Sequence, residues 1–279
     1  MSSTSTYEIP VGDLTFDVLI SGPDDGIPLV ALHGFPESAA SWGKVTPLLT
    51  AAGYRVIAPN QRGYSAGARP KGWMLQDRAP GSRRRRIARR TRPVRRASGR
   101  PRLGFGGRLA GRRSPSEPDP QSDRDLGPPP HRLRLGTPRG RGPKKQRSSY
   151  IGLLRQEGKA EEVLSEDNFR RLRAMFDGQI DPEFADEHIR VLSGEGALTG
   201  ALNWYRAMTR DFGDIDRTTV PTTYVWSTGD TALGRAGAER CGEFVDAPYE
   251  FVVLDGGSHW IPEERAEELA EAILARAGS

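Results

Sequence analysis

The chain has 279 residues and a formal net charge of +5, a length that suits one large domain or a core domain with an inserted cap. A single cysteine, Cys241, excludes an internal disulfide, and no apolar run reaches the roughly 18 residues that a membrane span needs. The first ten residues have neither a basic start nor an apolar stretch, so we expect no signal peptide and a cytoplasmic location.

The modest net charge hides two segments of opposite sign. Residues 71–147 hold 21 Arg and 3 Lys against 5 acidic residues, a formal charge of +19. The rest of the chain holds 17 basic and 31 acidic residues, a formal charge of −14. An asymmetry of this size indicates that the two segments obey different constraints.

The first 70 residues predict the opening of an α/β sheet. Residues 7–11 and 14–20 predict two strands joined by a tight turn. Residues 27–32 form a short, almost wholly apolar run, which predicts a strand buried on both faces, and residues 54–58 predict another buried strand. Between them, residues 38–52 predict a helix that ends at Gly53.

The segment 71–147 interrupts this pattern. It has no sustained helical or alternating period, and runs of Arg and Pro divide it. Such a composition buries too little apolar area to offset the entropy of ordering the chain, so we expect this segment, taken alone, to be disordered.

Periodic signals return near residue 148 and continue to the C-terminus. Helices are predicted over residues 150–157, 161–164, 167–177, 182–192 and 198–208. Strands at 222–226 and 249–254 then alternate with helices at 231–244 and 262–277. This order of strand, helix, strand and helix predicts an α/β fold with a mostly parallel sheet.

Two polar residues follow the last two predicted strands. Asp230 comes after 222–226, and His259 comes after 249–254. The carboxyl ends of parallel strands meet at one edge of a sheet, where sites form, so we expect the two side chains to lie together. In such a pair the carboxylate orients the imidazole, which acts as a general base.

A glycine-containing loop follows the apolar run 27–32 and predicts an oxyanion site. The glycine lets the backbone approach a substrate closely, and the N–H of the residue after it can donate to a developing negative charge. The residues of this candidate oxyanion loop are His33, Gly34, Phe35 and Pro36.

Several of these stretches together resemble the epoxide hydrolase branch of the α/β-hydrolase superfamily. They are His-Gly-Phe-Pro at 33–36, Arg-Gly-Tyr-Ser at 62–65, Asn-Trp-Tyr-Arg at 203–206, and the settings of Asp230 and His259. The resemblance covers roughly 200 residues in two blocks. It implies an α/β-hydrolase fold in which two tyrosines of a helical cap, matched by Tyr205 and Tyr150, bind the epoxide oxygen and act as the acid. Asn60 departs from the family, which commonly has Asp there.

The resemblance also predicts how the chain divides. Residues 1–70 are the N-terminal part of the core, 148–215 the helical cap and 216–279 the C-terminal part of the core. Residues 71–147 stand where the nucleophile region belongs. The family reads Gly-His-Asp-Trp-Gly there, and nothing in 71–147 matches it. The one Gly-x-Ser-x-Gly, centred on Ser65, opens no helix because Arg69 and Pro70 follow, so we reject Ser65 as the nucleophile.

A shifted reading frame accounts for the missing motif. Codons built from the last two bases of each residue and the first base of the next permit Gly-His-Asp-Trp-Gly over 100–104. This places the expected Asp near Pro101 and Arg102, while the chain as written holds no nucleophile. The same shift permits Tyr-Arg-Ile-Glu-Arg-Leu-Val over 75–81 and Ser-Val-Pro-His near Gly136. We therefore hypothesise a frame slip near residue 71 that is reversed near 147.

The expected activity is hydrolysis of an epoxide to a diol through an Asp ester, with a small apolar electrophile as substrate and neither metal nor cofactor. One alternative is a haloalkane dehalogenase or another α/β-hydrolase. A second is a basic nucleic-acid-binding protein on a non-catalytic hydrolase scaffold, because phosphates attract such an Arg-rich stretch. Residues 71–147 contain only Trp73 and Phe105 to stack bases, which makes nucleic acid the weaker alternative. The sequence leaves the oligomeric state open.

Sequencing the gene across codons 65–155 tests the frame hypothesis. We expect a base gained or lost near each end of the segment and an uninterrupted shifted frame that reads Gly-His-Asp-Trp-Gly. Stop codons in that frame, or a codon other than Asp at the central position, would refute the hypothesis.

Overall fold

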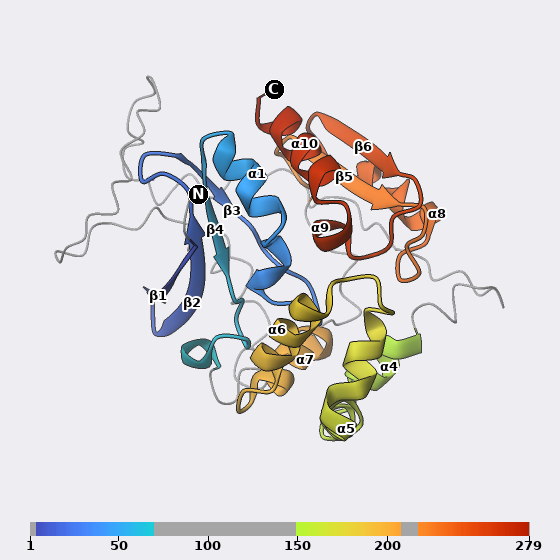
Figure 1. Cartoon of the computed structure of the whole chain (residues 1–279). Helices are drawn as coiled ribbons and strands as arrows, with labels where there is room; N and C mark the ends of the chain where they lie inside the picture. The colour runs from blue at the N-terminus through green and yellow to red at the C-terminus, as the bar shows by residue number, and fades with distance from the viewer. Residues whose placement is uncertain (1–3, 70–148, 208–216, 279) are drawn as a thin grey trace, which may run out of the picture.

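The computed structural model of the chain describes residues 4–69, 149–207 and 217–278. Figure 1 shows three groups of elements: the N-terminal strands in blue, the C-terminal strands in orange and red, and a layer of helices in yellow and orange below both. The α/β class predicted from the sequence is confirmed, since strands that pair in parallel alternate with helices along the chain. The predicted domain boundaries near 70, 148 and 216 remain predictions.

The N-terminal strands form a sheet of order β1-β2-β4-β3. The antiparallel pairs β1–β2 and β2–β4 lie on one side, and β3 runs parallel to β4. The strands are β1 (Ser5–Val11), β2 (Leu14–Ser21), β3 (Ile27–Val30) and β4 (Tyr54–Pro59). The second sheet pairs β5 (Thr222–Ser227) with β6 (Tyr249–Leu254), in parallel. Both parallel pairs send their carboxyl ends toward the helical layer (Figure 1).

The prediction that residues 27–32 are buried on both faces is wrong. Ile27, Val30 and Leu32 are 60%, 62% and 55% exposed. Among the described residues, β3 has β4 as its hydrogen-bonded neighbour on one side and no strand on the other. An apolar run of this kind is typical of a strand with a further strand on each side, and the described part of the chain provides a strand on one side only.

Two helices join the N-terminal and C-terminal parts of the fold. Helix α1 (Val45–Ala51) packs on β4, and α10 (Ala266–Ala277) packs against α1 and β5, as Figure 1 shows at the top of the molecule. Val45 and Leu49 of α1 share one apolar core with Val56 of β4 and Ala270 of α10. The two ends of the chain therefore build a common core.

Both helices are shorter than predicted. The helix expected over 38–52 is a 3₁₀ helix (Ala39–Trp42) followed by α1, and Gly43 between them packs closely against the ring of Phe184. The helix expected over 262–277 is split into α9 (Ile261–Glu264) and α10 at Arg265. The helix expected over 231–244 is also wrong: the structure has only α8 (Arg235–Ala238) and a 3₁₀ helix (Cys241–Phe244).

Four helices form the layer over the ends of the strands. They are α4 (Ser149–Leu154), α5 (Lys159–Met175), α6 (Pro182–Leu192) and α7 (Ala197–Ala207). Leu154, Leu164, Leu172, Leu192 and Leu202 form its buried core. The two helices predicted at 161–164 and 167–177 appear as one element with non-helical backbone between Glu166 and Phe169.

The helical layer contacts the N-terminal part through two glycines. The backbones of Gly63, after β4, and Gly200, on α7, touch so closely that a Cβ added to Gly200 would lie 2.5 Å from the Gly63 oxygen. Gly63 also has φ +96°, which side chains rarely adopt. Beside this contact the indole N–H of Trp204 donates to the carbonyl of Arg62 at 2.9 Å. Only glycine at both positions permits this approach.

We expect Gly200→Ala to lower the free energy of unfolding by about 1–3 kcal/mol, because the added methyl group separates α7 from the Gly63 loop. Urea unfolding measures the change. Gly237→Ala in α8 is the matched control: nothing lies within 4 Å of its added Cβ, so a neutral or slightly stabilising effect of roughly 0.5 kcal/mol is expected. Equal effects of the two substitutions would contradict the role of the glycine contact.

Candidate active site

Asp230 and His259 face each other in the loops that follow β5 and β6. Asp230 Oδ2 lies 2.9 Å from His259 Nδ1. Asp230 Oδ1 accepts hydrogen bonds from the backbone N–H groups of Ala232 and Leu233, each at 2.7 Å. The Asp230 side chain is buried, whereas 32% of the His259 side chain is exposed. A fixed, buried acid thus orients an imidazole that a reactant can still reach.

The electrostatics of this pair favour an ionised Asp230 and a basic imidazole. Burial acts to raise the pKa of Asp230, but the hydrogen bonds from His259, Leu233 and Ala232 outweigh it and hold the pKa below its ordinary value. The hydrogen bond to Asp230 raises the pKa of His259, against the effect of burial. With Nδ1–H directed at Asp230, Nε2 is the atom left for proton transfer.

The candidate oxyanion loop follows β3 and is held by His33. Its Nδ1–H donates to the Gly34 carbonyl at 2.8 Å, and its Nε2 accepts from the Gln61 N–H at 3.1 Å. Burial lowers the pKa of His33 to about 4, so the ring is neutral. His33 therefore stabilises the conformation of the loop, and neither of its ring nitrogens is free for proton transfer.

The backbone donors of this loop differ in availability. The Gly34 N–H donates to Glu37 Oε2 at 3.1 Å, so it is already engaged. Phe35 is joined to the fully buried Pro36 by a cis peptide bond, and its ring packs edge-on against Tyr205 at 5.3 Å between centroids. Pro36 has no N–H, and the Phe35 N–H has no acceptor among the described residues, so it is left for a substrate oxygen.

The two predicted tyrosines come from the helical layer and lie near each other. Tyr150 is on α4 and Tyr205 on α7, two helices that pack together. Burial raises the pKa of both hydroxyls. Tyr150 raises the pKa of Tyr205 further, and the charge of Asp230 raises the pKa of Tyr150 further. Both hydroxyls are thus protonated and near the acid–base pair, as a proton donor must be.

The neighbours of Tyr205 in the Asn-Trp-Tyr-Arg stretch have structural contacts. Arg206 pairs with Glu161 of α5 at 2.7 Å and with Asn203 at 3.1 Å, inside the helical layer. Trp204 contacts Arg62, as described above. These contacts fix α7 and with it the direction of Tyr205.

Ser65 has the environment of a structural residue. Its side chain is fully buried, donates to the Asn60 carbonyl at 2.7 Å and accepts from the Asp17 N–H at 2.9 Å. Asn60, where the family commonly has Asp, accepts from the Ala39 N–H at 2.9 Å. Neither residue is placed to attack a substrate.

The sequence reasoning missed three buried polar residues beside the site. Glu37, His188 and Glu263 come from the loop after β3, from α6 and from α9. His188 and Glu263 are hydrogen-bonded at 3.1 Å, and the charges of both act on Glu37. Glu37 directly follows the oxyanion loop and Glu263 follows His259 closely, so proximity to the two motifs was the available signal. His188 had no local signal.

The described ranges 4–69, 149–207 and 217–278 contain no side chain of Asp, Ser or Cys bonded to His259 Nε2. The predicted position of the nucleophile near Pro101 and Arg102 lies outside these ranges. Within them, no group of three or more His, Cys, Asp and Glu side chains is arranged to hold a metal ion. No helix of the described part is both long enough and apolar enough to cross a membrane.

Comparison with known proteins places this geometry in a family. The model of the alpha/beta hydrolase family matches residues 29–272. Epoxide hydrolase A of Mycobacterium tuberculosis is 29% identical over 92% of this chain and 92% of its own length. The AB hydrolase superfamily protein YfhM of Bacillus subtilis is 29% identical over 98% of both chains. The crystal structure of epoxide hydrolase A from Mycobacterium thermoresistibile, 21% identical, superposes with a TM-score of 0.67 over 99% of each chain.

These similarities agree with the resemblance to epoxide hydrolases that the sequence motifs predicted, and the superposed structure supports the fold. Since the family model spans most of the sequence, from β3 to α10, the chain belongs to the alpha/beta hydrolase family.

Proposed function

We propose that the chain carries the site of an epoxide hydrolase, and that the site is incomplete in the sequence as it stands. The observation that carries the proposal is the Asp230–His259 pair, joined at 2.9 Å, with the protonated hydroxyls of Tyr150 and Tyr205 nearby in the facing layer. The similarity to a protein named epoxide hydrolase A over nearly the whole chain supports the choice of substrate class.

In the frame-restored chain, an Asp expected near Arg102 attacks an epoxide carbon and forms an alkyl ester. The opened oxygen takes a proton from the tyrosine pair, while the Phe35 N–H is placed for the later oxyanion. His259 Nε2 then removes a proton from water, which hydrolyses the ester and releases the diol. Asp230 stabilises the imidazolium that forms.

The incompleteness is supported by two features of the described residues. No nucleophile contacts His259 there, and the sheets β1-β2-β4-β3 and β5-β6 are not hydrogen-bonded to each other. Among the described residues β3 is an edge strand of its sheet, which leaves its backbone free to pair with a further strand, and the apolar side chains of Ile27, Val30 and Leu32 are exposed. A chain that lacks the strand and nucleophile at this edge has little or no activity in our proposal.

The alternative of a haloalkane dehalogenase shares the Asp nucleophile and the base. A halide leaves as a stable anion and needs no proton, whereas an opened epoxide needs an acid. The pairing of Tyr150 with Tyr205 therefore favours the epoxide.

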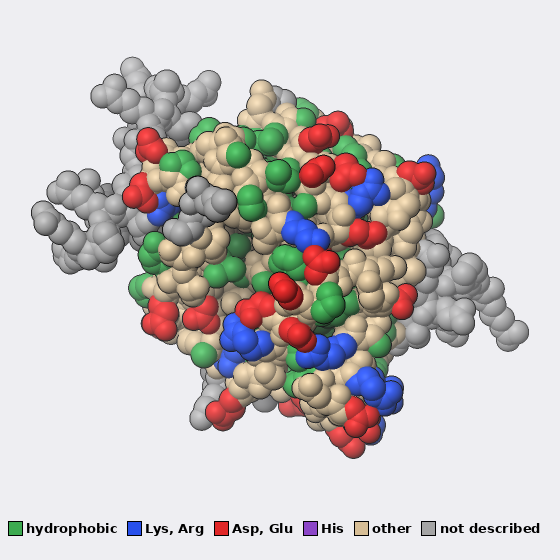
Figure 2. Space-filling view, in the orientation of Figure 1, with side chains coloured by type: hydrophobic (Ala, Val, Ile, Leu, Met, Phe, Trp, Pro, Cys, Tyr) green, Lys and Arg blue, Asp and Glu red, His purple; other side chains and the backbone are tan. Residues whose placement is uncertain are grey.

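The alternative of a nucleic-acid-binding protein has no support on the face that Figure 2 shows. Figure 2 shows acidic and basic side chains intermixed on the face in view, without a continuous basic patch. Phosphate binding requires clustered positive charge. The basic segment 71–147 lies outside the described residues.

The first test compares the present chain with a frame-restored chain on a panel of apolar epoxides, measuring diol. We expect no diol above background from the present chain and steady turnover from the restored one. In the restored chain, His259→Gln should lower the rate of ester hydrolysis by roughly 10²–10⁴-fold, because the general base is lost. Tyr205→Phe should lower epoxide opening, with no comparable loss on haloalkanes.

Steady diol formation by the present chain would disprove its impairment. Halide release without diol formation by the restored chain would replace the epoxide with the haloalkane as substrate.

A second test needs no substrate, since His259 can be titrated by NMR in the present chain. We expect its pKa to lie above the ordinary value of 6.5, because the hydrogen bond to Asp230 favours the charged ring. In Asp230→Asn the pKa should fall, because burial then dominates, while the Asn oxygen can still accept from Ala232 and Leu233. Glu239→Gln, which removes an exposed acid on the neighbouring helix, is the control and should leave the pKa unchanged. An unshifted His259 in Asp230→Asn would contradict the pairing.

A further inference from the structure

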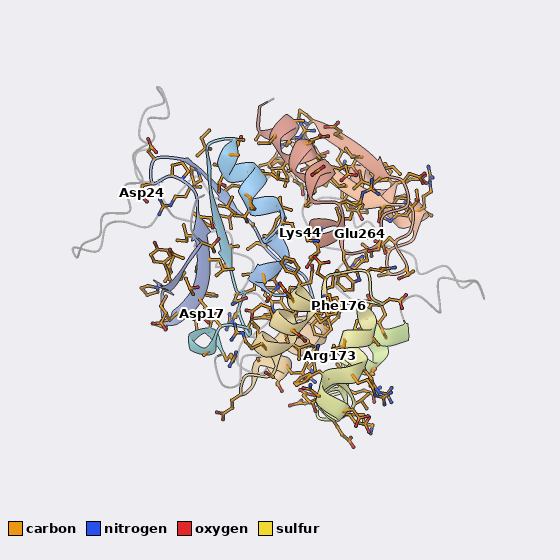
Figure 3. The ribbon with its side chains drawn as sticks, viewed as in Figure 1. Asp17, Asp24, Lys44, Arg173, Phe176 and Glu264 are labelled. Carbon is orange, nitrogen blue, oxygen red and sulfur yellow. The ribbon has the colours of Figure 1, made fainter. Side chains whose placement is uncertain are left out.

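A buried group of polar side chains lies where the helical layer meets the site. Its members come from three separate parts of the fold: Glu37 and Ser38 from the loop after β3, His188 from α6, and Glu263 from α9. The side chains of His188 and Glu263 are completely buried. The ring of Phe176, which Figure 3 labels, lies beside this group, 5.5 Å from the ring of His188 between centroids.

The hydrogen bonds of His188 define its charge. Its Nδ1 accepts from the Ser38 N–H at 3.1 Å, so this nitrogen carries no proton. The Ser38 hydroxyl donates to the same nitrogen at 2.9 Å. Nε2 must then carry the proton, which it donates to Glu263 Oε1 at 3.1 Å. Burial lowers the pKa of His188 to about 4, in agreement with a neutral ring.

The two carboxyl groups of this cluster lack a donor on their facing sides. Glu37 Oε2 accepts from the Gly34 N–H, and Glu263 Oε1 accepts from His188. Glu37 Oε1 and Glu263 Oε2 are buried without a donor among the described residues, and the two groups lie within hydrogen-bonding reach of each other. Two carboxylates in contact away from water cannot both be ionised, because each charge opposes the other.

Within the part of the chain that the structure describes, no cation neutralises the pair fully. The charged and titratable neighbours on the packed elements are His188, His259 and Lys44, the last of which pairs with Asp181 at 2.7 Å. Burial raises the pKa of Glu37 to about 7, with a further rise from the charge of Glu263, and burial raises that of Glu263 to about 8. Uptake of one proton is the remaining way to satisfy both oxygens.

We propose that Glu37 and Glu263 share one proton and, with the neutral His188, form a buried lock that holds the helical layer against the two loops of the site. The lock connects α6 to the Gly34 N–H of the oxyanion loop through the side chains of His188, Glu263 and Glu37. Glu263 lies on α9, which begins directly after the loop that carries His259. Loss of the shared proton leaves two buried negative charges in contact and loosens this junction. The proposal is independent of the proposed reaction, because it concerns the chain without substrate.

The lock makes stability depend on pH in a defined direction. Because the folded-state pKa values of Glu37 and Glu263 exceed the ordinary 4.5, the free energy of unfolding falls as pH rises toward about 8. His188 and His33, with lowered pKa values, act in the opposite direction below pH 6.5. The effect of the Glu37–Glu263 pair on the free energy of unfolding is therefore measured between pH 6.5 and 8. His259, whose pKa is raised, adds to the fall there.

Thermal unfolding of the full chain from pH 6.5 to 9 tests the lock. In Glu263→Gln the side-chain oxygen still accepts from His188, and the amide donates to Glu37 Oε1 in place of the shared proton. We expect the midpoint temperature of unfolding of the unsubstituted chain to fall by roughly 2–4 °C more than that of Glu263→Gln over this pH range. Glu37→Gln should flatten the curve in the same way, and the share that His259 contributes should persist in both variants.

Glu267→Gln, an exposed acid on α10, is the matched control and should keep the pH dependence of the parent. If both Gln variants also keep it, the shared proton is disproved.

Infrared spectra of the parent provide a readout that does not depend on any variant folding. A carbonyl stretch of a buried protonated carboxyl group should be present at pH 6.5 and lost by pH 9. Its absence at pH 6.5 would overturn the proposal.

Discussion

The candidate site depends on the packing of helices α4–α7 against the loops at the ends of the strands, because its residues come from both sides. Asp230 and His259 lie in the loops after β5 and β6, and Tyr150 and Tyr205 lie on the helices. Phe176, at the end of α5, helps to join the two sides by packing against Trp260, at 4.8 Å between ring centroids. Since a displacement of about 1 Å can strongly reduce a rate, this junction determines whether the groups act together.

The junction combines close backbone contact with buried polar contact. Gly63 and Gly200 bring α7 to the N-terminal part of the fold without side chains between them. His188 reaches from α6 to Ser38 and Glu263, and a buried polar group of this kind is stable only when its hydrogen bonds are made. Apolar packing alone permits many relative positions of two layers, whereas these directional contacts select one.

The sequence predicted those structural features that depend on neighbouring residues, and it missed contacts between residues far apart in the chain. Asp230 and His259 were placed together because parallel strands bring their carboxyl ends to one edge. The helix predicted over 231–244 failed because the three glycines of this stretch disfavour a continuous helix. The burial predicted for Ile27 and Val30 assumed a strand on each side of β3. The contact of His188 with Ser38 joins residues 150 positions apart, which no local pattern can indicate.

The parts of the chain that position the acid–base pair are not the part that would complete the candidate site. Leu49 of α1, Val56 of β4 and Ala270 of α10 pack in one core, so the first and last parts of the chain position each other without the segment between them. Asp230 and His259 depend only on β5, β6 and their loops, which belong to the last part. In the proposed reaction the nucleophile belongs to a strand expected between β3 and β5, where the sequence has the Arg-rich segment. On this proposal, an altered middle segment removes the reaction while the residues that would complete it keep their positions.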